Sequence, residues 1–198
     1  MKRVLIPTIA VVLVSGSAVL AECKCGIAKV ENGWCTDCKV GYVAGVKIKS
    51  DALFESLQGH EVDEAKIKCP SCTKAHRAGG FCEAYKTGFV DGKAYHSWVA
   101  YRLANGEFNR VDDIKCTACR KAAEESGWCE SCGVGYVAHH KFADKTEYEK
   151  AVQAQKVLRL AAESKCEKCA VAMVSDGECE QCKVKYANGE KSKSGSGG

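Results

Sequence analysis

The chain has 198 residues, of which 46% are apolar and 27% charged, with 15 cysteines and a formal net charge of +4. This near balance of charge argues against nucleic acid as a partner, because nucleic-acid binding needs a strongly basic surface. Cysteine at about 8% of residues indicates a framework of metal sites or disulfides rather than incidental thiols.

Residues 1–21 have the pattern of a secretory signal peptide. Lys2 and Arg3 give a positive start, residues 4–14 are apolar, and small residues precede the expected cleavage before Glu22. The apolar run is shorter than the roughly 20 residues that span a bilayer, so an uncleaved anchor is the less favoured alternative. We therefore expect a periplasmic or extracellular protein with no stable membrane span after cleavage.

Four copies of one cysteine motif follow the leader. Their third cysteine lies at positions 35, 82, 129 and 179, a spacing that is typical of a repeat architecture. The predicted units are Cys module 1 with a connector helix (22–66), a degenerate Cys module 2 with a connector helix (67–113), Cys module 3 with a long helix (114–163), Cys module 4 (164–190) and a disordered tail (191–198).

Modules 3 and 4 each carry two Cys-x-x-Cys hooks that are nine residues apart. Their cysteines are Cys116, Cys119, Cys129 and Cys132, and Cys166, Cys169, Cys179 and Cys182. One such hook directs two thiolates at one ion, and two hooks complete a tetrahedral sulfur site that suits Zn²⁺. The arrangement resembles the zinc-ribbon and rubredoxin-knuckle family over about 15–20 residues of each repeat. The resemblance implies a structural ion held by these cysteines.

Modules 1 and 2 depart from this pattern. Module 1 offers Cys23, Cys25, Cys35 and Cys38, so its first hook is Cys-x-Cys. Module 2 offers Cys69, Cys72 and Cys82, with Tyr85 at the fourth ligand position. His76 is the candidate fourth ligand, His60 and His96 are further candidates, and a weak or absent site is the alternative. The sequence thus predicts three or four zinc ions.

Each module is predicted to consist of short β-hairpins with cysteines at their tips. An aromatic residue at positions 42, 89, 136 and 186 marks a short strand after each fourth ligand position. A glycine precedes the third cysteine by two residues, at 33, 80, 127 and 177, where a tight turn requires positive φ. The aromatic residues directly before the third cysteine are predicted to shield the metal or the core: Trp34, Phe81 and Trp128.

Helices are predicted between the modules. Residues 50–58 and 97–105 begin at serine caps, and residues 144–163 begin with Asp144 and Glu147 in capping-box spacing. The last helix has an apolar stripe that is expected to pack on neighbouring modules: Tyr148, Val152, Leu158 and Ala162. The predicted fold is a small metal-stabilised α+β repeat, with four β-hairpin Cys modules joined by α-helices.

Disulfides are the main alternative to metal, because cysteines outside the cytoplasm usually pair. An odd number of cysteines would leave one unpaired, and a disulfide within a Cys-x-x-Cys hook is strained. Iron in the same sites would make an electron carrier, and metal-free hooks a thiol–disulfide oxidoreductase, although no thioredoxin-like βαβ pattern surrounds any hook.

No phosphate loop, nucleophile elbow or carboxylate pair stands out, so the sequence favours a non-enzymatic role. The predicted function is a secreted or periplasmic metal-binding scaffold for an unidentified protein partner. A soft-metal buffer or sensor is the alternative, and the oligomeric state is left open.

Overall fold

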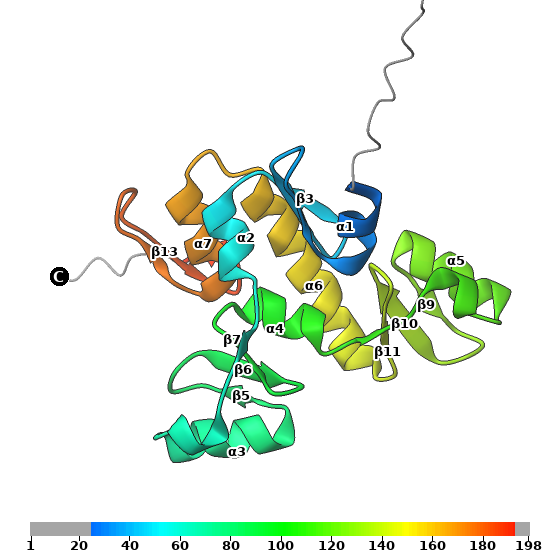
Figure 1. Ribbon diagram of the computed structural model, residues 1–198, viewed down its shortest axis with the longest axis horizontal. Coiled ribbons are helices and arrows are strands. Elements are labelled where there is room, and N and C mark those ends of the chain that lie inside the picture. The colour runs from blue at the N-terminus through cyan, green and yellow to red at the C-terminus, as the bar shows by residue number, and fades with distance from the viewer. Residues whose placement is uncertain (1–24, 193–198) are drawn as a thin grey trace, which may run out of the picture.

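The computed structural model describes residues 25–192, so the predicted signal peptide, Cys23 and residues 193–198 lie outside the described part. Four small antiparallel sheets alternate with helices (Figure 1), which confirms the predicted α+β class. Each module starts with a short helix, and these helices are α1 (Cys25–Glu31), α3 (Pro70–Ala78), α5 (Thr117–Glu125) and α7 (Glu167–Ser175). The prediction of a hairpin at the first hook is therefore wrong, because the alanine-rich, charged segments between the hooks favour helix.

After this helix, three strands form an antiparallel meander in each module. They are β1 (Trp34–Cys35), β2 (Val40–Val43) and β3 (Val46–Ile48); β5 (Phe81–Cys82), β6 (Thr87–Val90) and β7 (Lys93–Tyr95); β9 (Trp128–Cys129), β10 (Val134–Val137) and β11 (His140–Phe142); β12 (Glu178–Cys179), β13 (Val184–Ala187) and β14 (Glu190–Lys191). The predicted strand after each fourth ligand position is the central strand of its sheet.

Two short strands extend the middle sheets. β4 (His60–Glu61) pairs with β7, and β8 (Glu107–Phe108) pairs with β11, which gives the strand orders β4-β7-β6-β5 and β8-β11-β10-β9. A 3₁₀ turn follows each of these strands and leads to the first cysteine of the same module. These turns are η1 (Glu64–Lys66) in module 2 and η2 (Val111–Asp113) in module 3. Modules 2 and 3 therefore share one construction, from the strand before the first cysteine to the end of the sheet.

The turn between each module helix and its sheet has its positive φ one residue before the predicted glycine. The residues in the left-handed conformation are Asn32, Gly79, Ser126 and Asp176, with φ of 54°, 65°, 59° and 52°. The glycine that follows joins helix to sheet: Gly127 N–H donates to the Ala122 carbonyl at 2.9 Å, and its own carbonyl accepts from Tyr136 N–H at 2.8 Å. This is the hydrogen-bond pattern of a helix that ends in a left-handed cap.

Polar side chains at three of these caps reach the β-turn at the far end of the hairpin. Asn32 Oδ1 accepts from Ala44 N–H at 2.7 Å, and Asp176 Oδ1 accepts from Asn188 N–H at 2.7 Å. Ser126 Oγ makes the equivalent bond in module 3. The residue type at the cap is thus explained by a second role, because asparagine, aspartate and serine offer a short acceptor where the chain must turn.

Connector helices follow the first three sheets at the predicted positions. They are α2 (Asp51–Ser56), α4 (Trp98–Ala104) and α6 (Lys145–Ala162). Ser50, Ser97 and Asp144 are their N-caps, each with a side-chain oxygen that accepts a backbone N–H, as predicted. These caps fix where each helix begins and hence which residue meets the sheet.

Each connector helix places an aromatic ring on a glycine of the preceding sheet. In module 3, a Cβ atom at Gly135 would lie 2.3 Å from Tyr148 Cδ2, so only glycine allows this contact. The aromatic residue before the third cysteine packs on the same ring, with the Trp128 and Tyr148 centroids 5.4 Å apart. The same arrangement recurs in module 1 with Gly41, Phe54 and Trp34, and in module 2 with Gly88, Tyr101 and Phe81.

Helix α6 is the centre of the molecule (Figure 1), and the main core surrounds it with side chains from α2, α4, α7 and the sheets of modules 1 and 3. Its buried residues are Ala151, Ala154, Gln155, Val157, Leu158 and Ala161. The predicted packing role is confirmed, but the predicted stripe is displaced, because Tyr148, Val152 and Ala162 lie at its edge. Within residues 25–192, no helix has both the length and the apolar character needed to cross a membrane.

We predict that Gly135→Ala destabilises the protein by about 1–3 kcal/mol, because the added methyl group must displace the Tyr148 ring from the β10 surface. The matched control is Gly26→Ala, since a Cβ placed at this helical position has no atom within 4 Å apart from its chain neighbours and the backbone of its own helix. That control should be neutral or slightly stabilising. Urea unfolding followed by circular dichroism measures both, and equal midpoints for the two variants would contradict the ring-on-glycine contact.

Candidate metal centres

The first hook of each of modules 2, 3 and 4 lies at a helix N-terminus. Cys116 is the N-cap of α5 and Cys119 lies in its first turn; Cys69 and Cys166 hold the same N-cap place on α3 and α7. The backbone N–H of Cys72 points at Cys69 Sγ, 3.5 Å away. Such backbone hydrogen bonds lower the pKa of Cys69 and of Cys116, because they stabilise a negative sulfur. At Cys69 and Cys116 the helix N-terminus thus favours the thiolate, the form that binds metal.

The second hook is the turn between the first two strands of each sheet. Cys129 on β9 lies opposite Val134 on β10, and the intervening residues form the turn that carries Cys132. In module 4 the Cys182 N–H donates to Cys179 Sγ at 3.4 Å. The residue after each fourth ligand position is left-handed, at Lys39, Lys86, Gly133 and Lys183. All four modules therefore share one turn geometry.

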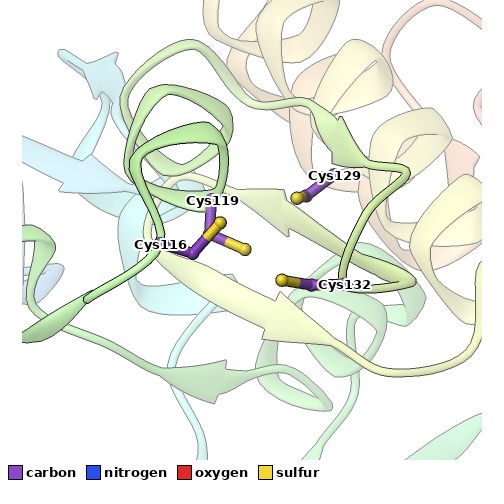
Figure 2. A group of neighbouring side chains, drawn as sticks. All are labelled: Cys116, Cys119, Cys129 and Cys132. Carbon is purple, nitrogen blue, oxygen red and sulfur yellow. The ribbon is translucent and has the colours of Figure 1, made fainter.

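The two hooks face each other, and their sulfur atoms converge. Figure 2 shows Cys116 and Cys119 at the start of a helix and Cys129 and Cys132 on the hairpin, with all four side chains directed to one point. In modules 3 and 4 the four sulfurs of each cluster lie within 4.8 Å of one another. In module 4, Cys166 Sγ is 3.8 Å from Cys179 Sγ and 3.7 Å from Cys182 Sγ.

These separations fit a tetrahedral thiolate site. Bonds of about 2.3 Å from zinc to four sulfurs imply sulfur–sulfur edges of about 3.8 Å. A disulfide instead requires about 2.05 Å between two sulfurs. The cysteines of modules 2, 3 and 4 are free thiols in the structure. The four clusters can accordingly hold metal ions, as the predicted knuckles require.

The thiols in the cluster of module 3 differ in pKa. Ser131 Oγ lies 3.2 Å from Cys129 Sγ, and this hydrogen bond lowers the pKa of Cys129 to about 6. Burial raises the pKa of Cys119 to about 12. Neighbouring thiolates repel one another, so four sulfurs at these distances cannot all ionise without a cation between them. A divalent ion supplies that charge.

Tyrosines on the central strands lie beside two of the clusters, a role that the sequence pattern did not reveal. Burial, with the nearby Cys119 thiol, raises the pKa of Tyr136 to about 12. Tyr186 stands in the same relation to Cys169 in module 4, and its pKa is also raised to about 12. In module 2 the corresponding residue is Phe89, which has no hydroxyl. The recurrence of the aromatic at a fixed offset was the available signal, but it indicated only a strand.

One edge of each cluster faces solvent. The second and third cysteines are buried in modules 3 and 4, whereas Cys132 and Cys182 are exposed. The hairpin side is therefore the solvent-facing side of these two clusters. The small satellite cores behind the sulfurs consist mainly of alanine, cysteine and one aromatic residue.

Module 1 brings three described thiols together. Cys25, Cys35 and Cys38 have sulfurs within 4.8 Å of one another. Cys25 is the first residue of α1, Cys35 is on β1, and Cys38 is in the following turn. Cys23, the predicted remaining ligand, lies outside the described residues, so its part in this cluster stays a prediction.

Module 2 also brings three thiols together, at Cys69, Cys72 and Cys82. No nitrogen of His76, its predicted partner, lies within 4.8 Å of all three sulfurs. The Nδ1 atom of His76 is 3.6 Å from Glu64 Oε2, and its ring packs edge-on against Phe89, with centroids 5.5 Å apart. The structure therefore places His76 on the same helix as Cys72 but next to the cluster rather than in it.

The other candidate histidines of module 2 also lie apart from the thiols. His96 Nδ1 is 3.1 Å from Thr87 Oγ1, and the His60 and His96 ring centroids are 6.4 Å apart. Neither side chain belongs to the thiol cluster.

No known protein family, curated protein or solved structure matches the chain.

We predict that Ser131→Ala weakens metal binding in module 3 by about tenfold at pH 7, in the range of other lost hydrogen bonds to ligands. Without the Ser131 hydroxyl the pKa of Cys129 rises from about 6 towards its ordinary value, so protons compete better with the metal. The loss should be larger at pH 6 than at pH 8.

The measurement is alkylation of Cys129 against chelator concentration, with the peptides analysed by mass spectrometry. Ser131→Thr keeps a hydroxyl and should retain affinity. Module 4 has Gln181 at this position and serves as the internal reference. An unchanged Cys129 protection curve in Ser131→Ala at pH 6 would show that this hydrogen bond does not support metal binding.

Proposed function

We propose that this chain is a secreted or periplasmic scaffold whose modules are stabilised by three or four zinc ions. The observation that carries the proposal is the convergence of four thiols at tetrahedral spacing in module 3 and again in module 4. The N-terminal pattern of residues 1–21 supports export. The scaffold would present its modules to an unidentified protein partner.

Metal explains the cluster geometry better than disulfides do. A pair of disulfides would draw the four sulfurs into two separate pairs, whereas the sulfurs of modules 3 and 4 surround a single point. At the first hook of module 3, backbone N–H groups lower the pKa of Cys116 and so favour its thiolate, the form that binds metal. Zinc suits such a four-thiolate site, while iron in the same site would serve electron transfer.

The ions of modules 3 and 4 would be structural. All four ligand positions are cysteines, so no position is open to water or substrate. The satellite core of module 3 is built from Ile114, Cys119, Ala122, Ala123, Cys129 and Tyr136. Such a small core contributes little burial, whereas zinc binding supplies about 10–16 kcal/mol in zinc-finger peptides. The ion would therefore hold α5 against its hairpin.

The arrangement of the modules supports a scaffold role. The connector helices α2 and α4 contribute to the core around α6. There Ser97 Oγ donates to the Val174 carbonyl and Gln155 Nε2 donates to the Ala44 carbonyl. These buried bonds join segments that are 77 and 111 residues apart in the sequence. In Figure 1, the helices α3 and α5 lie at the periphery, away from α6. We propose that these two peripheral modules carry the partner surface.

A soft-metal buffer or sensor is the second candidate function. It is favoured by module 2, where only three thiols converge and the fourth position is Tyr85. Such a site would release its ion more readily than a site with four thiolates. The two candidates differ in how many ions leave together.

Native mass spectrometry of the exported protein tests the metal proposal. We expect the mass excess of three or four zinc ions, and alkylation of every thiol after denaturation. A weak chelator that removes the ion of module 2 alone, while modules 3 and 4 keep theirs, would favour the buffer or sensor over the scaffold. A metal-free mass that is about two units lower per disulfide would overturn the proposal, and visible absorbance would identify iron instead of zinc.

A further inference from the structure

The second hook of module 2 is intact except for its last thiol. Cys82 pairs with Thr87 across the turn just as Cys129 pairs with Val134 in module 3. The residue after the fourth position is left-handed in both, with φ of 49° at Lys86 and 64° in module 3. Thr87 Oγ1 also donates to the Tyr85 carbonyl at 2.9 Å, which fixes the turn. Tyr85 therefore occupies the backbone position of a metal ligand.

The missing ligand is the one that would face solvent. In modules 3 and 4 the cysteine at this position is the exposed member of its cluster. Tyr85 is 66% exposed, so most of its side chain faces solvent. Cys72 and Cys82 remain buried, at 7% and 2% exposure. The three thiols thus converge at a cluster whose fourth position carries no thiol.

We propose that module 2 binds a thiolate-preferring divalent cation through Cys69, Cys72 and Cys82 and leaves its fourth coordination position to an external ligand, for which a small thiol fits best. The inference rests on the proposed metal-binding function and assigns a distinct role to one module. Modules 3 and 4, with four protein thiolates, are closed by comparison.

The chemistry is a ligand substitution without oxidation or reduction. Three thiolates on a divalent cation carry a charge of −1, and water completes the coordination. An incoming thiol loses its proton to solvent, its sulfur forms a bond to the metal, and the water leaves. The product carries −2, the same charge as the closed sites of modules 3 and 4. Because the fourth sulfur comes from outside, module 2 is the site at which an external thiol changes the ligand set.

The test uses the full chain loaded with ¹¹³Cd²⁺, each resonance being assigned through its coupling to cysteine Hβ protons. Cadmium bound by three sulfurs and water resonates at a lower chemical shift than cadmium bound by four sulfurs. We expect module 2 at the lower shift and modules 3 and 4 at the higher one. Titration with 2-mercaptoethanol should move the module 2 resonance alone to the four-sulfur range.

Substitutions at the fourth position provide matched controls. Tyr85→Cys should move the module 2 resonance to the four-sulfur range without added thiol and abolish the response to 2-mercaptoethanol. Tyr85→Phe should leave the wild-type shift and response unchanged, because the phenol does not bind the metal. The reciprocal change Cys132→Tyr should give module 3 the lower shift and the thiol response.

Two results would overturn the inference. One is a module 2 resonance that ignores 2-mercaptoethanol in the wild type and shifts in His76→Gln, which would show a closed site with an imidazole ligand. The other is cadmium bound in modules 3 and 4 but not in module 2. Absence of cadmium from modules 3 and 4 would instead refute the proposed metal-binding function, so the two failures are distinguishable.

Discussion

The structure depends on bringing the N-terminus of a short helix and the tight turn of a hairpin to the same point. In modules 3 and 4 each supplies two sulfurs, and backbone N–H groups point at a cysteine sulfur in both kinds of hook. The left-handed helix cap and the glycine after it hold these two pieces at a fixed distance, as Gly127 does between Ala122 and Tyr136. The metal clusters follow from this backbone arrangement, since the side chains need only extend from it.

The modules are joined by a second recurring contact, an aromatic ring on a bare strand glycine. The helix N-cap sets the position of the ring, and the glycine sets how closely the helix can approach the sheet. Module 4 has Lys185 where modules 1–3 have this glycine, and no connector helix follows it among the described residues. Its helix α7 instead packs directly on α2, α4 and α6. At this strand position, glycine thus marks the modules that are followed by a connector helix, and lysine marks the module that is not.

The features that could be predicted from the sequence are those set by the spacing of residues close together in the chain. The four thiol clusters, the central strands and the capped connector helices all follow from short-range patterns. The module helices were missed because the glycines and cysteines around them suggested turns, although the alanines between favoured helix. The stripe of α6 was displaced because its centre consists of small residues, Ala151 and Ala154, whose burial depends on close packing by distant segments. Similarly, nothing local showed that the His76 ring packs against Phe89 and lies near Glu64.

Contacts within a module join residues that are close in the sequence, whereas contacts between modules join residues that are far apart. This difference bears on the order in which the parts of the chain fold. Sulfurs that share a cluster in module 4 are 13 and 16 residues apart, so such loops close at small entropic cost as soon as they are synthesised. The bond from Gln155 to Ala44 spans 111 residues and cannot form until α6 exists. Because contacts between distant residues form slowly, we expect each module to form before the layer of helices between the modules. The layer of connector helices consolidates only after α6 has joined them.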